Sequence, residues 1–269
     1  MDRHTMNRRQ NLALFGGIGA ALGLGAAGML RAAEPAQGKA GTMAQMPWPY
    51  KPLDPDVAGQ RGFDSYLKGH CMYGSFDAVV MAVADQLGEP YTTFPAKMFV
   101  YGAGGVQGWG TLCGALNGAA AAIQMLSANP EPVTDALYRW YEHTALPDFE
   151  PKGMKFRNVA SVAGSPLCHP SIAKWCERSG LKSYSDQRKE RCGVLTGAVA
   201  RKTVMLLNEQ QKGLLTAVMA PDSRTGTCMT CHEKGGMLEN MRSKQTCNSC
   251  HTDETLAAHK HQKIAIKSL

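Results

Sequence analysis

Apolar residues recur at helical spacing through most of the chain between residues 63 and 220. The segments 75–88, 111–126, 134–146, 170–180 and 185–213 each place apolar side chains three or four residues apart. Ser75 and Thr134 are candidate N-caps, and Gly88 and Gly180 follow the last apolar turns of their segments. Pro170 suits a first helical turn. Only KMFVY, residues 97–101, has the composition of a short strand, so the pattern predicts a mainly α fold.

The N-terminal region reads as a targeting segment followed by a linker. Arg8 and Arg9 precede a mildly apolar run, residues 11–30, whose six glycines make it a poor membrane-spanning helix. We therefore predict a twin-arginine export signal over residues 1–33 and a periplasmic location. An uncleaved membrane anchor is the alternative. Residues 34–62 are rich in Pro, Gly and polar residues and predict a linker.

Composition excludes some classes of function. The apolar fraction is 44% over 269 residues, which is typical of a globular protein. The net charge of +7 is too small, and the basic residues too scattered, to favour nucleic-acid binding. A modest positive charge remains compatible with docking to an acidic redox protein.

The C-terminal segment, residues 221–269, has little apolar material of its own. Between residues 227 and 261 the large aliphatic side chains are three Met and two Leu. Such a short, polar segment needs a metal, a crosslink or a large prosthetic group to fold. The same segment contains Cys-x-x-Cys-His twice, at Cys228, Cys231, His232 and at Cys247, Cys250, His251.

These two motifs fit either a zinc ribbon or covalently attached haem. Fifteen residues separate the two Cys-x-x-Cys pairs, a spacing that four-cysteine zinc sites also show. Four thiolates would complete a zinc site and leave both histidines without a role. Histidine is 8 of 269 residues, so chance would place it at both positions about once in a thousand. Haem c uses all five positions, so we predict two haems, with His232 and His251 as proximal iron ligands.

The sixth ligand of each iron is not identified by the sequence. The candidates are His70, His143, His169, His259, His261, Met237 and Met241. Two histidines per iron would give a lower potential than a His/Met pair and would favour electron relay. His259 and His261 are equally compatible with solvated positions near the chain end.

Five further cysteines lie outside the haem motifs: Cys71, Cys113, Cys168, Cys176 and Cys192. Several fall near predicted helix starts, where the helix dipole favours a thiolate. This arrangement predicts an iron–sulfur cluster. Two disulfides with one free thiol, or a thiol-redox site, are the alternatives. A twin-arginine signal agrees with a cofactor that is inserted before export. Haem c is attached after export, so it cannot be that cofactor, whereas an iron–sulfur cluster can.

The glycine-rich run YGAGGVQGWG, residues 101–110, does not fit a dinucleotide-binding motif. Gln107 stands where a third glycine is needed, and no suitable acidic residue follows about 20 positions later. We interpret the run as a loop around the cluster or as a site of close helix packing.

With these residues in hand, residues 60–261 resemble a split-Soret cytochrome c. The helical part resembles a redox-associated family with one Cys, then C-G-A-x-x-G, then two further Cys. The matching positions are Cys71, the run Cys113–Gly118, Cys168 or Cys176, and Cys192. The resemblance implies a homodimer with two parallel haems per subunit, bis-histidine iron and an iron–sulfur centre, in an anaerobe such as a sulfate reducer. The extra cysteine leaves the fourth cluster ligand open.

We therefore expect an electron carrier of two domains, a helical cysteine-containing domain over residues 63–220 and a dihaem segment over residues 221–269. Its partners would be a second copy of the chain and periplasmic redox proteins, and the membrane only with an uncleaved signal. A terminal reductase or peroxidase with one open haem iron is the competing class.

Overall fold

The computed structural model describes residues 45–251 and shows a mainly α protein, as predicted. Its elements in chain order are α1 (Pro55–Leu87), η1 (Tyr91–Thr93), η2 (Ala96–Gly102), α2 (Gly114–Leu126), α3 (Pro130–His143), β1 (Ala145–Leu146), β2 (Ser161–Val162), α4 (Cys168–Ser179), α5 (Asp186–Gln211), α6 (Ser223–His232) and η3 (Cys247–Ser249). The predicted export signal and the candidate ligands His259 and His261 lie outside the described residues.

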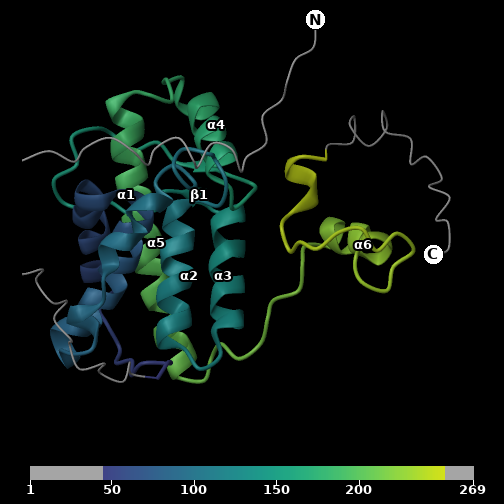
Figure 1. Ribbon diagram of the computed structural model, residues 1–269. Helices are drawn as coiled ribbons and strands as arrows, with labels where there is room; N and C mark the ends of the chain where they lie inside the picture. Colours follow the sequence, from purple (N-terminus) through teal and green to yellow (C-terminus); the bar gives the residue numbers. More distant parts are fainter. Residues whose placement is uncertain (1–44, 252–269) are drawn as a thin grey trace, which may run out of the picture. The chain divides into compact units, whose positions relative to one another are not determined.

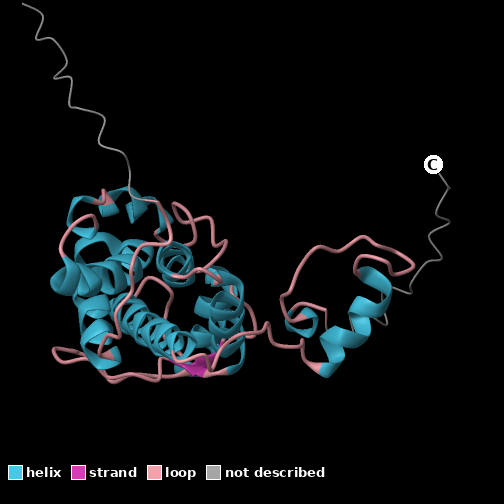
Figure 2. Cartoon of the chain, turned by 90° about the horizontal axis from the view of Figure 1, so that it is seen from below, coloured by secondary structure: helices cyan, strands magenta, loops and turns pink. Residues whose placement is uncertain are grey.

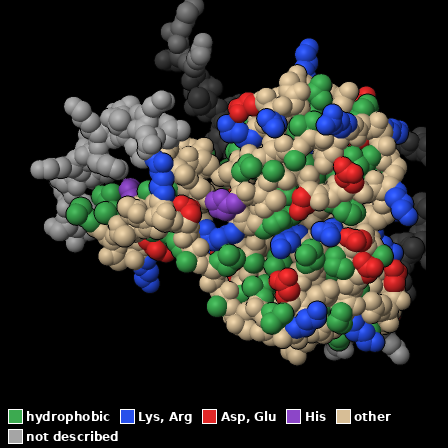
Figure 3. All heavy atoms as spheres, turned by 180° about the vertical axis from the view of Figure 1, so that it is seen from behind, with side chains coloured by type: hydrophobic (Ala, Val, Ile, Leu, Met, Phe, Trp, Pro, Cys, Tyr) green, Lys and Arg blue, Asp and Glu red, His purple; other side chains and the backbone are tan. Residues whose placement is uncertain are grey.

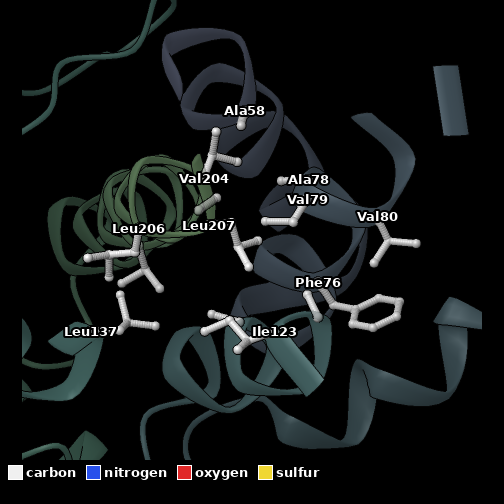
Figure 4. Close-up of a cluster of buried hydrophobic side chains, with 14 of the residues drawn as sticks. Ala58, Phe76, Ala78, Val79, Val80, Ile123, Leu137, Val204, Leu206 and Leu207 are labelled. Atoms are coloured by element: carbon white, nitrogen blue, oxygen red, sulfur yellow. The ribbon is translucent and has the colours of Figure 1, made fainter. Parts of the chain in front are cut away.

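The helices α1 and α5 form the centre of the helical part, and α2 and α3 pack against them (Figure 1). Their facing sides bury Val79, Ile123, Leu137, Val204 and Leu207 to 2% exposure or less (Figure 4). Each such side chain contributes about 1.5–3 kcal/mol when it leaves water. The helical part therefore has a hydrophobic core of its own.

Helix α1 differs from the sequence-based expectation at its start. It begins at Pro55, after Asp54, whose carboxylate accepts hydrogen bonds from the N–H groups of Asp56 and Val57. Residues 55–62, predicted as part of the 34–62 linker, are therefore helical. Ser75 lies inside the helix, where its hydroxyl donates to the carbonyl of Cys71 instead of capping an end. An aspartate cap followed by proline was the signal that this prediction overlooked.

Of the other predicted helix boundaries, some agree with the structure and some do not. Helix α4 ends at a left-handed Gly180, and α5 begins after Ser185, whose hydroxyl accepts from the N–H of Arg188, both as predicted. Helix α3 starts at Pro130, so Thr134 is not its cap. Residues 97–101 form part of the 3₁₀ helix η2 and not a strand. Two-residue strands β1 and β2 instead pair antiparallel, with Ala145 opposite Val162 (Figure 2).

The described part of the C-terminal segment contains α6, η3 and connecting loops. Of residues 221–251, only Thr225 and Thr246 are buried, and both are polar. The prediction that this segment lacks an apolar core of its own is confirmed.

Two further features bear on partners. Within residues 45–251, no helix combines the length and apolarity that crossing a bilayer requires. On the face shown in Figure 3, basic and acidic side chains are interspersed among apolar ones and form no continuous basic field.

Candidate functional site

Four of the five cysteines outside the haem motifs line one cavity of about 90 Å³. Cys71 comes from α1, Cys113 caps α2, Cys168 starts α4, and Cys192 lies in the second turn of α5. The chain thus gathers four thiols that are up to 121 residues apart in sequence around one small space.

Backbone hydrogen bonds hold two of these cysteines next to each other. The N–H of Cys113 donates to the carbonyl of Pro166 at 2.9 Å, and the N–H of Cys168 donates to the carbonyl of Thr111 at 2.7 Å. Leu112 and Leu167 form the antiparallel bridge between these bonds. The two helix starts are therefore locked together by main-chain contacts, which fixes where both thiols lie.

The Cys-Gly-Ala-x-x-Gly run allows α2 to approach α1 closely. A Cβ on Gly114 would lie 2.5 Å from the Sγ of Cys71, and one on Gly118 would lie 2.1 Å from the carbonyl oxygen of Met72. Real Cβ atoms do not make contacts this short, so only glycine fits. The glycines of this motif thus admit the Cys71 thiol to the cavity.

A break in α1 sets the position of Cys71. Gly69 and His70 leave the helical conformation, and His70 has φ 64° and ψ −167°. Left-handed φ is uncommon for a non-glycine residue, and such strain gathers at functional sites. The His70 imidazole lines the cavity and meets the ring of Tyr66 edge-on at 5.9 Å.

Burial governs the acidity of these thiols. Burial, together with the nearby thiols of Cys113 and Cys192, raises the pKa of Cys71 to about 12. Burial also raises the pKa of Cys113 and of Cys168, and neighbouring cysteines add to both shifts. The raised pKa keeps Cys71, Cys113 and Cys168 protonated in the absence of a cation, whereas a bound metal would stabilise thiolates.

Two arginines also face the cavity, and the sequence analysis missed both. Arg188 approaches the Sγ of Cys192 at 3.9 Å through Nη1. Arg191 is buried, and both of its terminal nitrogens donate to the hydroxyl of Ser171 at 3.1 Å. Arg188 lies four residues and Arg191 one residue before Cys192, and this closeness in sequence was the signal that could have identified them. Positive charge here would offset the negative charge of a thiolate-bound cluster.

Cys176 does not belong to this group, although α4 carries it as predicted. It is half-buried and does not line the cavity. None of the nine cysteines, all within the described residues, forms a disulfide, so the disulfide alternative finds no support. Among residues 45–251, no three His, Cys, Asp or Glu side chains converge closely enough to hold a single metal ion. The four thiols surround a space instead, which fits a cluster of several atoms.

The glycine-rich run folds into a loop beside the cavity. Gly104, Gly105, Gly108 and Gly110 have positive φ, as do Val106 and Gln107. Gly104 lines the cavity, and a backbone hydrogen bond from Gly104 acts on the Cys71 thiol. The run is thus a loop beside the cysteine cavity, and its role around a cluster stays a prediction.

The two Cys-x-x-Cys-His motifs lie against each other. Helix α6 carries Cys228, Cys231 and His232, and η3 carries Cys247 just before Cys250 and His251. The pKa of Cys247 is raised by burial and by the adjacent thiol of Cys228, with which it hydrogen-bonds. Attachment points on separate motifs are therefore in direct contact.

Nearby polar contacts orient this segment. The Nδ1 of His232 is 2.8 Å from the side-chain oxygen of Asn240, which leaves Nε2 as the nitrogen suited to an iron. Buried Glu142 on α3 accepts from the N–H of Thr246 at 3.2 Å and from its hydroxyl at 3.1 Å. These two hydrogen bonds connect Thr246, the residue before the second motif, to α3 of the helical part.

The remaining candidate sixth ligands are dispersed. His70 lines the cysteine cavity, and exposed His169 follows Cys168. His143 lies 3.5 Å from the hydroxyl of Thr246, beside the second motif. Met237 is 77% exposed, and the N–H of Met241 donates to the carbonyl of His232. Their roles as iron ligands stay predictions.

Comparison with known proteins identifies the family. Residues 73–206 match a family model described as a redox-active protein with the pattern C_GCAxxG_C_C. The chain is 35% identical over 266 residues to split-Soret cytochrome c of Desulfovibrio desulfuricans, covering 92% of this chain and 95% of the relative. This chain belongs to the split-Soret cytochrome c family. It is thus an electron-transfer cytochrome.

A solved structure of split-Soret cytochrome c from Desulfovibrio desulfuricans ATCC 27774, described for a novel iron centre, has the same fold. The match has a TM-score of 0.72 at 35% identity and covers 80% of this chain and 97% of the other. Cys71 lies just before the span matched by the family model, and Cys113 precedes Gly114 where the pattern prints Gly before Cys. The resemblance inferred from the sequence is confirmed.

Proposed function

We propose that this protein is an exported dihaem electron carrier with two haems per chain. Cys228 and Cys231 would tether one haem and Cys247 and Cys250 the other, with His232 and His251 as proximal ligands. The proximity of the two motifs carries this proposal: the N–H of Cys247 donates to the hydroxyl of Thr225 on α6 at 3.3 Å, which brings the two attachment sites together. Adjacent haems exchange electrons readily and also supply the apolar surface that the segment lacks.

We further propose an iron–sulfur cluster in the cysteine cavity, with Cys71, Cys113, Cys168 and Cys192 as its ligands. The residues fit such a group, because four thiols, two of them buried and two half-buried, line one space of about 90 Å³ and two arginines face it. The iron centre named for the relative supports this assignment. A cluster there would supply a further one-electron site. Cys176 is not among the proposed ligands.

The location and the assembly of the protein are also part of the proposal. The twin-arginine pattern supports a periplasmic location, and family membership supports a homodimer. Acidic redox proteins of the same compartment are the expected partners, given a net charge of +7.

Mass spectrometry of the mature chain tests the central claim. It should show the added mass of two haem groups, retained after denaturation. Iron and acid-labile sulfide in excess of haem iron should accompany the native protein. A chain without covalent haem would contradict the proposal. Rapid carbon monoxide binding at one reduced haem would favour the competing reductase or peroxidase, which needs an open iron.

A further inference from the structure

A second cavity, of about 490 Å³, lies next to the haem-binding segment. Its walls come from α2, α3, the loop before α4 and residues 243–245, which lead directly to Cys247. Leu112, Tyr138, Pro166 and Leu167 make much of the lining apolar. The exposed lining is mainly apolar, but charged side chains of α3 and polar side chains of residues 243–245 also reach it, so the pocket can take a ligand that is apolar with a charged edge.

Arg139 on α3 lines this cavity, and two of its guanidinium nitrogens make no hydrogen bond to the described residues. The residue is 8% exposed, and its Nη1 is buried without a hydrogen-bond partner among residues 45–251. Its Nε is 3.5 Å from a carboxylate oxygen of Asp135 but makes no hydrogen bond. A guanidinium stays charged in proteins, and leaving its donors unsatisfied in a buried position is costly. An anion in the cavity would therefore be stabilised, because it could accept the hydrogen bonds that the guanidinium of Arg139 does not make.

The neighbouring charged groups already have other partners. Asp135 accepts from the N–H of Met219 at 3.1 Å, and Glu142 accepts from Thr246. Glu131 pairs with Lys244 at 2.6 Å across the mouth. His143 faces Thr246, and the pKa of Tyr138 is raised to about 12 by burial. None of these groups satisfies the Nη1 of Arg139, which leaves room for one further carboxylate.

We propose that this cavity receives the propionate edge of the haem tethered at Cys247 and Cys250, and that Arg139 binds a propionate carboxylate. Gln245 lines the cavity two residues before Cys247, and Thr246 is fixed to Glu142 between them. A haem tethered at Cys247 and the unsatisfied guanidinium of Arg139 would therefore be neighbours in space. Guanidinium and carboxylate groups form two parallel hydrogen bonds. This inference rests on the proposed haem attachment.

Arg139→Gln in the haem-loaded protein tests the pairing. The cation stabilises ionised propionate and disfavours ferric iron, so its loss should lower the midpoint potential of one haem at alkaline pH. It should also raise the propionate pKa, so that this potential becomes pH-dependent at a higher pH than in the wild type. Arg139→Lys should restore most of both effects. Arg201→Gln, which removes an arginine paired with Asp56 on another face, should change neither.

The outcomes separate this inference from the proposed function. Absence of covalent haem would refute the proposed function itself. Two haems per chain with potentials and pH profiles unchanged in Arg139→Gln would refute only the propionate pairing. A wild-type potential that shifts with added acetate would also refute it, since the site would then hold a diffusible anion. If Arg139→Gln does not fold, Arg139→Met, which removes the charge and keeps an unbranched side chain, should show the same shifts.

Discussion

A Cβ on Gly114 would lie 2.5 Å from the Sγ of Cys71 and 2.5 Å from the carbonyl oxygen of Gly102. The first helical residue of α2 thus forms a wall against which the α1 thiol and the η2 main chain both pack. In this motif the cysteine can serve as a ligand, and the glycine next to it leaves space for the Cys71 thiol.

Replacing Gly114 with alanine should therefore disturb the cysteine cavity. We expect Gly114→Ala to cost about 1–3 kcal/mol of the free energy of unfolding, as overpacking does, and to lower the non-haem iron content. Denaturant unfolding and iron analysis measure both. Gly226→Ala in α6 is the control, because its new Cβ would meet only Pro221 at 3.8 Å. Equal iron content in the two variants would contradict the steric account.

The four cavity cysteines should differ from Cys176 in their effect on cluster content. Serine at Cys71, Cys113, Cys168 or Cys192 should remove most non-haem iron and labile sulfide, since a cluster loses a thiolate ligand. Cys176→Ser should retain both, because that thiol lies outside the cavity. Haem content should stay at two per chain throughout. Loss of the cluster in Cys176→Ser alone would show that the ligand assignment is wrong.

Asn240 should tune the haem whose iron His232 is proposed to bind. Asn240→Asp places an anion beside Nδ1, which increases the basicity of the imidazole and stabilises ferric iron. The midpoint potential of one haem should fall by on the order of tens of millivolts. Redox titration followed in the Soret band measures it. Asn158→Asp, whose parent amide donates to Pro147 in the helical part, should leave both haem potentials unchanged.

Glu142 should make stability depend on pH. Burial raises its pKa in the folded protein above the ordinary 4.5, outweighing the hydrogen bonds from Thr246. An acid with a raised pKa destabilises the fold as pH rises from about 4.5 through the folded value. Glu142→Gln should therefore melt at a higher temperature than the wild type at pH 8 and at the same temperature at pH 4.

Glu131→Gln, an exposed carboxylate on the same helix, is the matched control and should follow the wild type at both pH values. A melting difference for Glu142→Gln that is equal at pH 4 and pH 8 would rule out burial of its charge as the cause.

The sequence was informative where local chemistry decides the structure. Gly180, Ser185 and the two Cys-x-x-Cys-His motifs act through their immediate neighbours, so pattern alone located them. The start of α1 was missed because the proline-rich composition around it outweighed the Asp54 cap. The strand predicted at residues 97–101 was wrong, because β-like composition does not distinguish a strand from the 3₁₀ helix that ends at Gly102.

The composition of the cysteine cavity could not be read from sequence. Which four of five cysteines converge depends on how α1, α4 and α5 pack, and Cys168 and Cys176 share one helix but face differently. The roles of Arg139, Arg188 and Glu142 depend on burial, which periodicity assigns poorly to charged residues. The break at His70 likewise follows from tertiary contacts and has no local signature.

The contrast between a helical part with its own interior and a C-terminal segment without one has a consequence for biogenesis. In an exported protein, the helical part can be completed and inspected before translocation, while the segment stays accessible to the haem ligation machinery afterwards. Chains that never acquire porphyrin would present a loose peptide to periplasmic proteases. With haem attached as proposed, the same lack of apolar residues that makes the segment depend on haem would provide a means of discarding unfinished molecules.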